Sequence, residues 1–522
     1  MFREATWNSK STNVDLQLQN RSLIWNRKST FVDLLFRGVA VSRFIGRQQE
    51  LKRLLDATRK RTASFIVLKG RRRVGKSRLI EEFGKNFQHH YVFTGLPPDK
   101  ATTAANQLGE FSRQVARQFR TPPAQYQDWS DALWAVAERV QSGKVLLFLD
   151  EISWMGSEDP TFLGKIKDVW DQRLQKNTQL ILIVCGSASA WIEKNLLSSM
   201  GFVGRISYTL TLEELPLCDS GKFWPANVSA YEKFKLLALT GGVPKYLEEI
   251  DPKLPAEENI RRLCFTRGGF LVDEFERIFA DIFLRGSDDY RRIVDVLSSG
   301  SKEVSEIQQA LHRTAAGRIP EYLWELDLAG FIARDYAWNL KSGDDAKLSR
   351  YRLKDNYLRF YLKYIKKNLG KIARDSYTFK SLTSLPEWHA MMGLQFENMV
   401  LNSRRQIQQL LNLNADEIVN DNPFYQRKTL RQRGCQVDYL IQMKFGTLYV
   451  CEIKFSKNEI TSAVISEVQA KIDALALPKG TSCRPVLIHV NGVSTELLDS
   501  DYFAAMIDMT SMLAATVDLR TS

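Results

Sequence analysis

Cysteine and histidine are scarce in this chain of 522 residues, and neither is arranged for metal or nucleophilic chemistry. No C-x-x-C pair occurs, the five histidines have no metal or triad spacing, and no G-x-S-x-G segment is present. This pattern argues against a zinc site, a serine hydrolase and disulfide staples, and it favours a reduced, cytoplasmic setting. The six cysteines stand at positions 185, 218, 264, 435, 451 and 483.

Long apolar runs and repeats are missing as well. No stretch reaches the length needed to cross a bilayer, so no membrane partner is expected. No repeat period, heptad array or low-complexity tract suggests a solenoid or a coiled coil. With 44% hydrophobic and 25% charged residues, the composition is that of a globular protein, and the length allows about three or four domains.

Acidic residues are outnumbered by basic ones. The chain has 73 Lys and Arg against 60 Asp and Glu, a net charge of +13 and a pI near 9.3. This excess favours an anionic partner, and nucleic acid, DNA in particular, is the first candidate. The alternative is a basic surface without such a role, because the charges are spread along the chain rather than gathered in one patch.

The first 43 residues are rich in Ser, Asn and Arg, with an apolar stretch at 31–36 that resembles part of an organellar presequence. Glu4, Asp15 and Asp33 do not fit an acid-poor transit peptide. We therefore expect residues 1–43 to form a poorly ordered extension.

Between residues 44 and 215, short apolar runs alternate with helical patterns, which is typical of a parallel α/β sheet. Strands are predicted at 64–69, 90–94, 144–150 and 179–185. Helices are predicted over 228–285, in a helix-turn-helix pattern at 290–334, and around 356–366. After Pro386 the pattern is a helix (394–411), a β-hairpin (436–455), another helix and a last strand (485–490).

A phosphate-binding loop is predicted between the first strand and the helix that follows it. Its sequence matches G-x-x-x-x-G-K-[ST] at every position. Glycines let the backbone turn its N–H groups toward phosphates, and the helix N-terminus adds partial positive charge. Lys76 is expected to bridge the β and γ phosphates of ATP, and Ser77 to hold Mg²⁺. The segment is Gly70-Arg71-Arg72-Arg73-Val74-Gly75-Lys76-Ser77.

An acidic pair follows the apolar run VLLFL, where a P-loop protein carries its second motif. Asp150 is expected to bind Mg²⁺ and Glu151 to act as general base toward the attacking water. The alternative is a strand that ends in two solvated acids. Ser187, after LILIVCG, is a candidate sensor of the γ phosphate or else a helix cap, and Arg205 is a candidate arginine finger.

The chain resembles the archaeal-type AAA+ ATPases that carry a restriction-endonuclease-like C-terminal domain. The resemblance covers about residues 44–490. Its motifs are FIGRQQELKRL, GRRRVGKS, FLDE, the VGR segment, GGVPKYL at 241–247 and YRLKDNYLRFYLKY at 351–364. It implies ATP binding and an α/β fold: a P-loop ATPase domain (44–215), a helical lid with Pro244 (216–285), a winged helix with its linking helix (286–366) and the nuclease-like α/β domain (367–522). By analogy with AAA+ proteins, a homo-oligomer such as a ring is one candidate assembly.

The winged-helix region does not have a clearly basic reading helix. Arg313 and Arg318 are offset by Glu321, Glu325 and Asp327. A role in protein docking or between domains is therefore as well supported as DNA reading.

The C-terminal hairpin predicts a second candidate site. With Lys444-Phe445-Gly446 as a three-residue loop and Gly446 left-handed, Asp438 lies opposite Glu452, and Lys454 follows on the same face. Two carboxylates so close favour a divalent cation, here Mg²⁺. The pattern resembles the P-D-(D/E)-x-K nucleases, in which Lys454 would orient the attacking water, with Glu397 as an extra carboxylate. The alternative is ordinary charge pairing in a fold that only binds partners.

The leading hypothesis is thus an ATPase whose nucleotide state controls a Mg²⁺-dependent DNA nuclease module. The runner-up is a nucleotide-dependent switch or assembly factor without nuclease activity.

Overall fold

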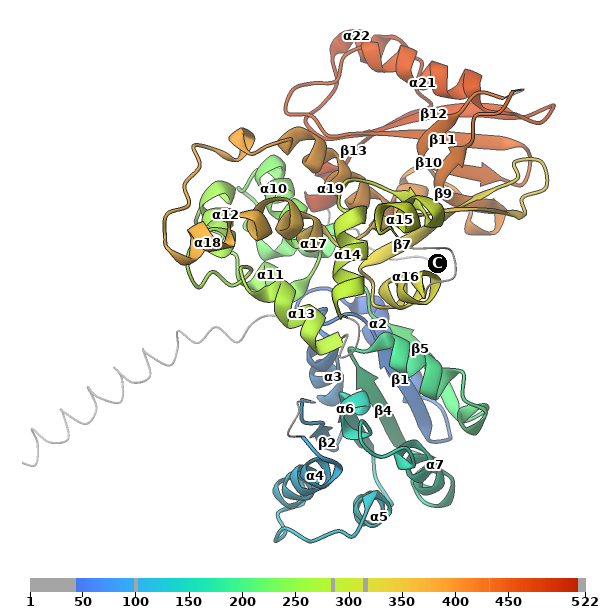
Figure 1. The fold of residues 1–522 in the computed structure, drawn as a ribbon. Coiled ribbons are helices and arrows are strands. Elements are labelled where there is room, and N and C mark those ends of the chain that lie inside the picture. Colours follow the sequence, from blue (N-terminus) through green and yellow to red (C-terminus); the bar gives the residue numbers. More distant parts are fainter. Residues whose placement is uncertain (1–43, 98–101, 283–286, 313–317, 431, 515–522) are drawn as a thin grey trace, which may run out of the picture. The chain divides into compact units, whose positions relative to one another are not determined.

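The computed structural model describes residues 44–97, 102–282, 287–312, 318–430 and 432–514. The predicted extension 1–43 lies outside these residues. Five parallel strands form the first sheet, in the order β2-β3-β4-β1-β5 (Figure 1). They are β1 (Ser64–Lys69), β2 (His89–Thr94), β3 (Val145–Asp150), β4 (Leu180–Gly186) and β5 (Ile206–Thr211).

The four predicted strands are confirmed to within one residue at each end. Strands β1, β3 and β4 are continuous apolar runs because both of their faces are buried. β5 was not predicted, since this edge strand is half-exposed and carries Ser207, Thr209 and Thr211 in place of an apolar run. The sheet therefore has one more strand than the sequence pattern indicated.

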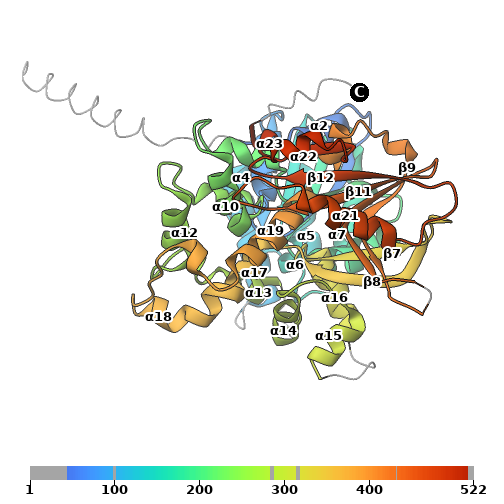
Figure 2. The same ribbon diagram turned by 90° about the horizontal axis from the view of Figure 1, so that it is seen from above.

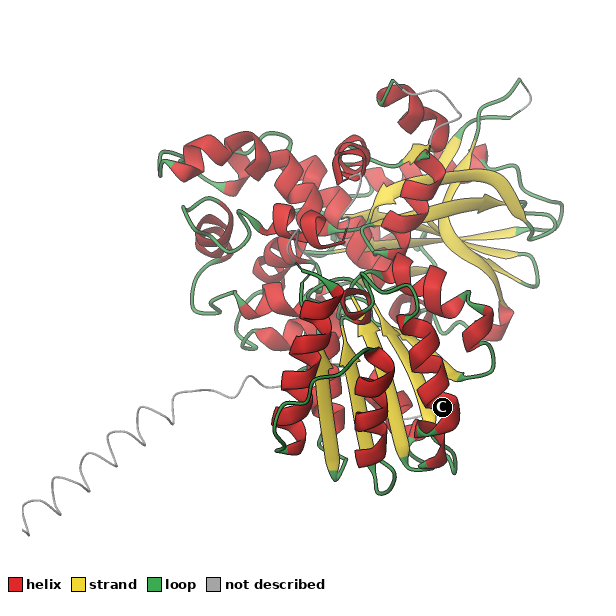
Figure 3. Cartoon of the chain, turned by 60° about the horizontal axis from the view of Figure 1, so that its bottom comes forward, coloured by secondary structure: helices red, strands yellow, loops and turns green. Residues whose placement is uncertain are grey.

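Helices pack along this sheet (Figure 3). Two of them begin at side-chain caps: Thr103 and Asn106 form a capping box before α4, and Asp128 accepts from two backbone amides before α5. The helices are α2 (Gln48–Ala57), α3 (Lys76–Gly84), α4 (Ala104–Phe119), α5 (Trp129–Arg139), α6 (Ile152–Met155), α7 (Phe162–Gln172) and α8 (Ser189–Ile192).

A helical region follows, as predicted for 228–285. Within it, the short helix α11 begins at Pro244, whose fixed φ suits the first position of a helix. The helices are α9 (Leu217–Ser220), α10 (Ala230–Thr240), α11 (Pro244–Glu248), α12 (Ala256–Cys264) and α13 (Glu274–Ile282).

Next come three helices and a small antiparallel sheet of order β6-β8-β7. The β7–β8 hairpin docks on the C-terminal sheet: Trp338 donates to Gln442, and Asn420 donates to the carbonyl of Gly343. The elements are α14 (Ser287–Leu297), β6 (Lys302–Glu303), α15 (Val304–Ala310), α16 (Ile319–Leu328), β7 (Ile332–Trp338), β8 (Asp345–Leu353) and α17 (Asn356–Phe360), which continues into a π-helical turn, Tyr361–Ile365.

The last region is a five-stranded mixed sheet of order β13-β12-β11-β10-β9. Tyr439 pairs with Cys451 and Gln442 with Leu448, so the predicted register of the β10–β11 hairpin is confirmed. The elements are α18 (Leu369–Ala373), α19 (Trp388–Asn402), α20 (Arg404–Leu410), β9 (Ile418–Gln426), β10 (Cys435–Met443), β11 (Thr447–Lys454), α21 (Ala463–Ala474), β12 (Ser482–His489), α22 (Thr495–Asp499), β13 (Ala505–Asp508) and α23 (Thr510–Ala514).

Two predictions for this region were wrong in detail. The single helix expected over 394–411 is the pair α19 and α20, interrupted at Ser403, and β9 and β13 were not expected. β9 contains Asn420, Asp421, Asn422 and Pro423, residue types that are depleted in strands. Its pairing with β10 decides its conformation, and that contact is not visible in the local pattern.

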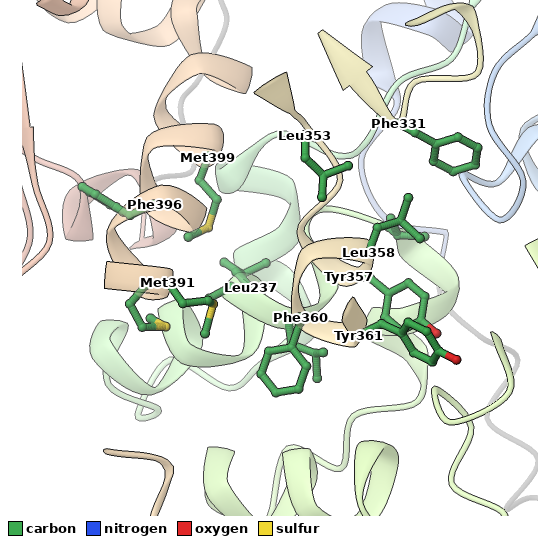
Figure 4. Packing of buried hydrophobic residues seen from close by; sticks show 14 of the residues in the cluster. Leu237, Phe331, Leu353, Tyr357, Leu358, Phe360, Tyr361, Met391, Phe396 and Met399 are labelled. Atoms are coloured by element: carbon green, nitrogen blue, oxygen red, sulfur yellow. The ribbon is translucent and has the colours of Figure 1, made fainter. Parts of the chain in front are cut away.

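One hydrophobic core runs from the helical region into the C-terminal sheet. Helices α10, α17 and α19 lie together at its centre (Figure 2). Their side chains Leu237, Leu358 and Phe396 belong to this cluster, which Figure 4 shows at close range. The segment around α17 is therefore packed between the helical region and the C-terminal region.

Candidate functional site

The phosphate loop joins β1 to α3, as predicted. Gly70 has a φ of 150°, and a Cβ at this position would clash with the carbonyl of Leu212. Gly75, with a φ of 90°, stands directly before the first residue of α3. The buried Lys76 donates from Nζ to the carbonyl oxygens of Gly70 (2.8 Å) and Arg71 (3.0 Å). The loop thus curls around its own lysine.

The acidic end of β3 meets this loop. Ser77 donates from Oγ to Oδ2 of Asp150 at 2.7 Å, and the backbone amide of Glu151 donates to Oδ1 at 3.1 Å. The two predicted motifs, 73 residues apart in sequence, are therefore in contact. A hydroxyl and a carboxylate side by side are oxygen ligands of the kind that Mg²⁺ prefers.

Ser187 holds the side chain of Glu151. Its backbone amide and its Oγ both donate to Oε2 of Glu151, at 3.0 and 3.1 Å. The helix-cap alternative for Ser187 is wrong, because α8 begins after Ala188 and has no side-chain cap. The end of β4 thus orients the second acid of the pair.

Arg205 lies just before β5 and binds Asp171 through two bonds of 2.7 Å. The Asp171 carboxylate raises the pKa of this guanidinium. Among the described residues, the Arg205 guanidinium pairs with Asp171 and does not contact the phosphate loop. Its role as an arginine finger stays a prediction.

The side chains of Arg71 and Arg73 leave the phosphate loop for buried acids elsewhere in the chain. Arg71 pairs with Glu214 (2.9 Å) and with Asp355 (2.5 Å), the residue that caps α17. Arg73 pairs with the fully buried Glu274 of α13. Burial lowers the pKa of Arg71, but Asp355 leads the neighbours that outweigh it and raise the pKa overall.

The rest of the phosphate loop is held by contacts of Val74. Val74 is buried, and its carbonyl accepts from the guanidinium of Arg47 at 3.0 Å. Arg72 is half-buried, between the two arginines whose side chains are turned away. The predicted phosphate loop is therefore a backbone cradle, with Arg71 and Arg73 acting as its anchors.

The C-terminal candidate site forms on β10 and β11. Asp438 accepts from the backbone amide of Ile453 at 3.0 Å, and Glu452, across the hairpin, is 3% exposed. Burial, followed by the charge of Glu452, raises the pKa of Asp438. Lys454 reaches Glu452 at 3.2 Å and Glu467 of α21 at 2.6 Å. The predicted acidic and lysine set is thus gathered on one face.

Sequence reasoning missed Lys471 on α21. Its Nζ pairs with Oε2 of Glu452 and lies 3.4 Å from Oδ1 of Asp438. Glu467 and Lys471 are four residues apart, so they share a helix face, each next to the buried Val464 and Val468 stripe. That spacing, beside a predicted acidic hairpin, was the available signal.

Glu397 belongs to α19, and its pKa is affected by the charge of this site. Burial, and then the charge of Asp438, raises its pKa to about 7. Among the described residues, no three His, Cys, Asp or Glu side chains form a group that could hold a metal ion. The structure therefore does not bring Glu397 together with Asp438 and Glu452 as a third ligand. Two facing carboxylates fit a divalent cation by donor type, but an ammonium lies between them.

The P-loop and the acidic end of β3 together define an ATPase-type P-loop domain. A family model described as an ATPase domain predominantly from Archaea matches residues 44–250. An uncharacterized protein of Methanocaldococcus jannaschii is 25% identical over 365 residues, which are 68% of this chain and 76% of that protein.

Two solved structures are also similar. The Walker-type ATPase PABY2304 of Pyrococcus abyssi has a TM-score of 0.45 and 15% identity, covering 61% of this chain and 96% of its own. The ORC2 protein of Aeropyrum pernix has a TM-score of 0.38 and 13% identity, covering 64% and 95%. At these TM-scores neither likeness decides an arrangement or an activity for this chain. No helix among the described residues is both long and apolar enough to cross a membrane.

Proposed function

We propose that this chain is an AAA+ ATPase whose nucleotide state controls a C-terminal, Mg²⁺-dependent DNA nuclease module. The observation that carries the proposal is the side chain of Arg71, which starts in the phosphate loop and ends at Asp355, outside the P-loop domain. A phosphate loop that shifts on binding a nucleotide must move or lose this buried ion pair. The loop and the segment that follows β8 are therefore mechanically joined.

In the nucleotide half, each predicted residue has a role that its contacts support. Lys76 would turn from its loop carbonyls to the β and γ phosphates of ATP, and Ser77 with Asp150 would hold Mg²⁺. Glu151, oriented by Ser187, would accept the proton of the attacking water. Arg205 would leave Asp171 to reach a phosphate, in its own chain or in another copy.

A chain of buried polar contacts continues from Asp355 toward the C-terminal site. Asn356 donates to the carbonyl of Gln395 at 3.4 Å, and Asn398 donates to Oδ1 of Asn356 at 3.1 Å. Arg359 donates to Oε1 of Gln395 at 2.9 Å. These contacts fasten α17 to α19, the helix that carries Glu397, whose pKa responds to Asp438. A shift of α17 would thus change the surroundings of the carboxylate site.

The three helices and the hairpin of 286–366 serve this coupling as a winged helix between domains. The hairpin, which would be the wing, is occupied by Gln442 and Asn420 of the C-terminal sheet. Directly before α16, the exposed Arg318 is paired with Glu321 at 2.9 Å. Arg313 lies outside the described residues. Docking between domains therefore has more support than DNA reading by this region.

In the C-terminal half, Asp438 and Glu452 would hold Mg²⁺, and Lys454 would orient the water that attacks a phosphodiester. The net charge of +13 suits a DNA substrate. A second candidate, a nucleotide-dependent switch or assembly factor, is favoured by one observation: the two carboxylates are already neutralised by lysines, as in a site that binds no metal.

Plasmid cleavage with Mg²⁺, with and without ATP, tests the proposal on wild type, Lys76→Ala and Lys454→Ala. We expect cleavage that Lys454→Ala abolishes and that no longer responds to ATP in Lys76→Ala. ATP turnover without cleavage by the wild type under any nucleotide would refute the nuclease half and leave the switch.

A further inference from the structure

The carboxylate pair of the C-terminal site is served by two lysines that are not equivalent. Of the two carboxylates of the pair, Lys454 contacts Glu452, and its ammonium also pairs with the exposed Glu467 of α21. Lys471 contacts both Asp438 and Glu452, the two groups that would ligate a metal. Its ammonium is thus the one that bridges the pair.

We propose that Lys471 is a built-in competitor of the divalent cation: its ammonium occupies the position between Asp438 and Glu452 and must leave before a metal can bind. This inference rests on the proposed function, because it concerns access to the same metal site. It adds a residue and a mechanism of control that the hairpin pattern does not contain.

The physical argument is one of charge. The buried carboxylate of Glu452 and the half-buried one of Asp438, on directly opposed residues whose Cβ atoms are about 5 Å apart, repel each other and need a positive charge to remain ionised together. An ammonium and a divalent cation both meet that need at the same oxygen atoms, so they exclude each other. Lys471 is tethered to α21, which gives it a high effective concentration at the pair. A dilute metal, or one that gives up its water reluctantly, is at a disadvantage in this competition.

The arrangement also allows release of the lysine without unfolding. Lys471 is about one quarter exposed, and its flexible side chain can carry the ammonium from the pair to solvent. Val464 and Val468 hold α21 on the sheet independently of Lys471. The helix can therefore stay in place while the side chain moves.

Binding of Mn²⁺ to the full chain, measured by electron paramagnetic resonance without DNA or ATP, tests the inference. Lys471→Met is expected to bind Mn²⁺ about tenfold more tightly than wild type, given the coupling energies of close charge pairs. Lys85→Met is the control for the loss of one positive charge, and we expect its Mn²⁺ affinity to stay near wild type, because Lys85 pairs with Glu82 of α3 and has no contact with Asp438 or Glu452 among the described residues. Lys471→Arg, which retains the charge, should stay near wild type.

Equal or weaker Mn²⁺ binding by Lys471→Met, or no binding by either protein, would overturn the inference. A second measurement needs no variant. Acetylation of Lys471 in the wild type, followed by mass spectrometry, should accelerate when Mn²⁺ is added, while that of the exposed Lys85 should not; an unchanged rate for Lys471 counts against the competition. Because neither assay requires cleavage, a chain that passes both and cuts no DNA would refute only the nuclease proposal.

Discussion

The phosphate loop and the C-terminal carboxylate pair are built from similar residue types but are poised differently. At the loop, Lys76 binds neutral carbonyls and Asp150 binds a neutral hydroxyl, so a ligand that reaches these two side chains exchanges hydrogen bonds and displaces no ammonium or guanidinium from them. At the pair, Asp438 and Glu452 already bind Lys471. The first site is ready for an anion with its metal, whereas the second must give up a cation before it can accept another.

The largest expected effect tests whether the loop is anchored outside its own domain. Asp355→Ala should lower the free energy of unfolding by about 3 kcal/mol, the lower end for breaking a buried pair, because Arg71 keeps Glu214 as a partner while α17 also loses its cap. Asp295→Ala is the control, since its ion pair with Lys366 is about half-exposed and should contribute about 0–1 kcal/mol. Urea unfolding of both variants measures the difference. Equal losses of stability in the two variants would contradict a role of Asp355 in anchoring the phosphate loop.

The variant Glu151→Gln tests whether the nucleotide site uses Glu151 as its general base. We expect ATP turnover to fall by about 100-fold, the lower range for a general base, while ATP binding is retained. Turnover and equilibrium binding of a fluorescent ATP analogue separate the two. ATP turnover at the wild-type rate in this variant would show that Glu151 is not the general base.

The electrostatic state of the C-terminal site predicts a pH dependence. Since the pKa of Glu397 is raised to about 7 in the folded chain, the folded state binds its proton more tightly than the unfolded state does. Stability from this group is present below about pH 4.5, falls as the pH rises to about 7, and stays low above it.

Unfolding free energies of wild type and Glu397→Gln, measured from pH 4.5 to 8, should therefore converge at low pH. At high pH the variant should be more stable by about 1–3 kcal/mol. A constant difference across this range would mean that Glu397 does not titrate in it.

The smallest effect concerns the orientation of Glu151. Ser187→Ala removes one of two donors to that carboxylate and retains the backbone amide. Turnover should fall by about tenfold, consistent with the loss of one hydrogen bond to a charged group. Ser189→Ala, two residues on and outside this contact, is the control for turnover. An unaltered turnover rate in Ser187→Ala would show that its hydroxyl is not needed to orient Glu151.

What the sequence could predict follows from how local each feature is. Gly70 to Ser77 are contiguous, and the β10–β11 register depends on three loop residues, so both were correct. The partners of Arg71 lie 143 and 284 residues away, and no local pattern links them. β9 owes its strand to β10, and Lys471 reaches the pair only because α21 packs on the hairpin. Long-range packing, rather than motif chemistry, is what escaped prediction.

The acidic partners of Arg71 and Arg73 also bear on where the P-loop domain can be cut from the rest of the chain. The family match ends at residue 250, but Glu274 and Asp355, which neutralise Arg73 and Arg71, lie beyond it. A fragment cut at that boundary would retain both arginines without these acids. In such a fragment Arg71 would keep Glu214 but lose Asp355, and Arg73 would lose Glu274, so the phosphate loop would lose contacts that fix both of its arginines.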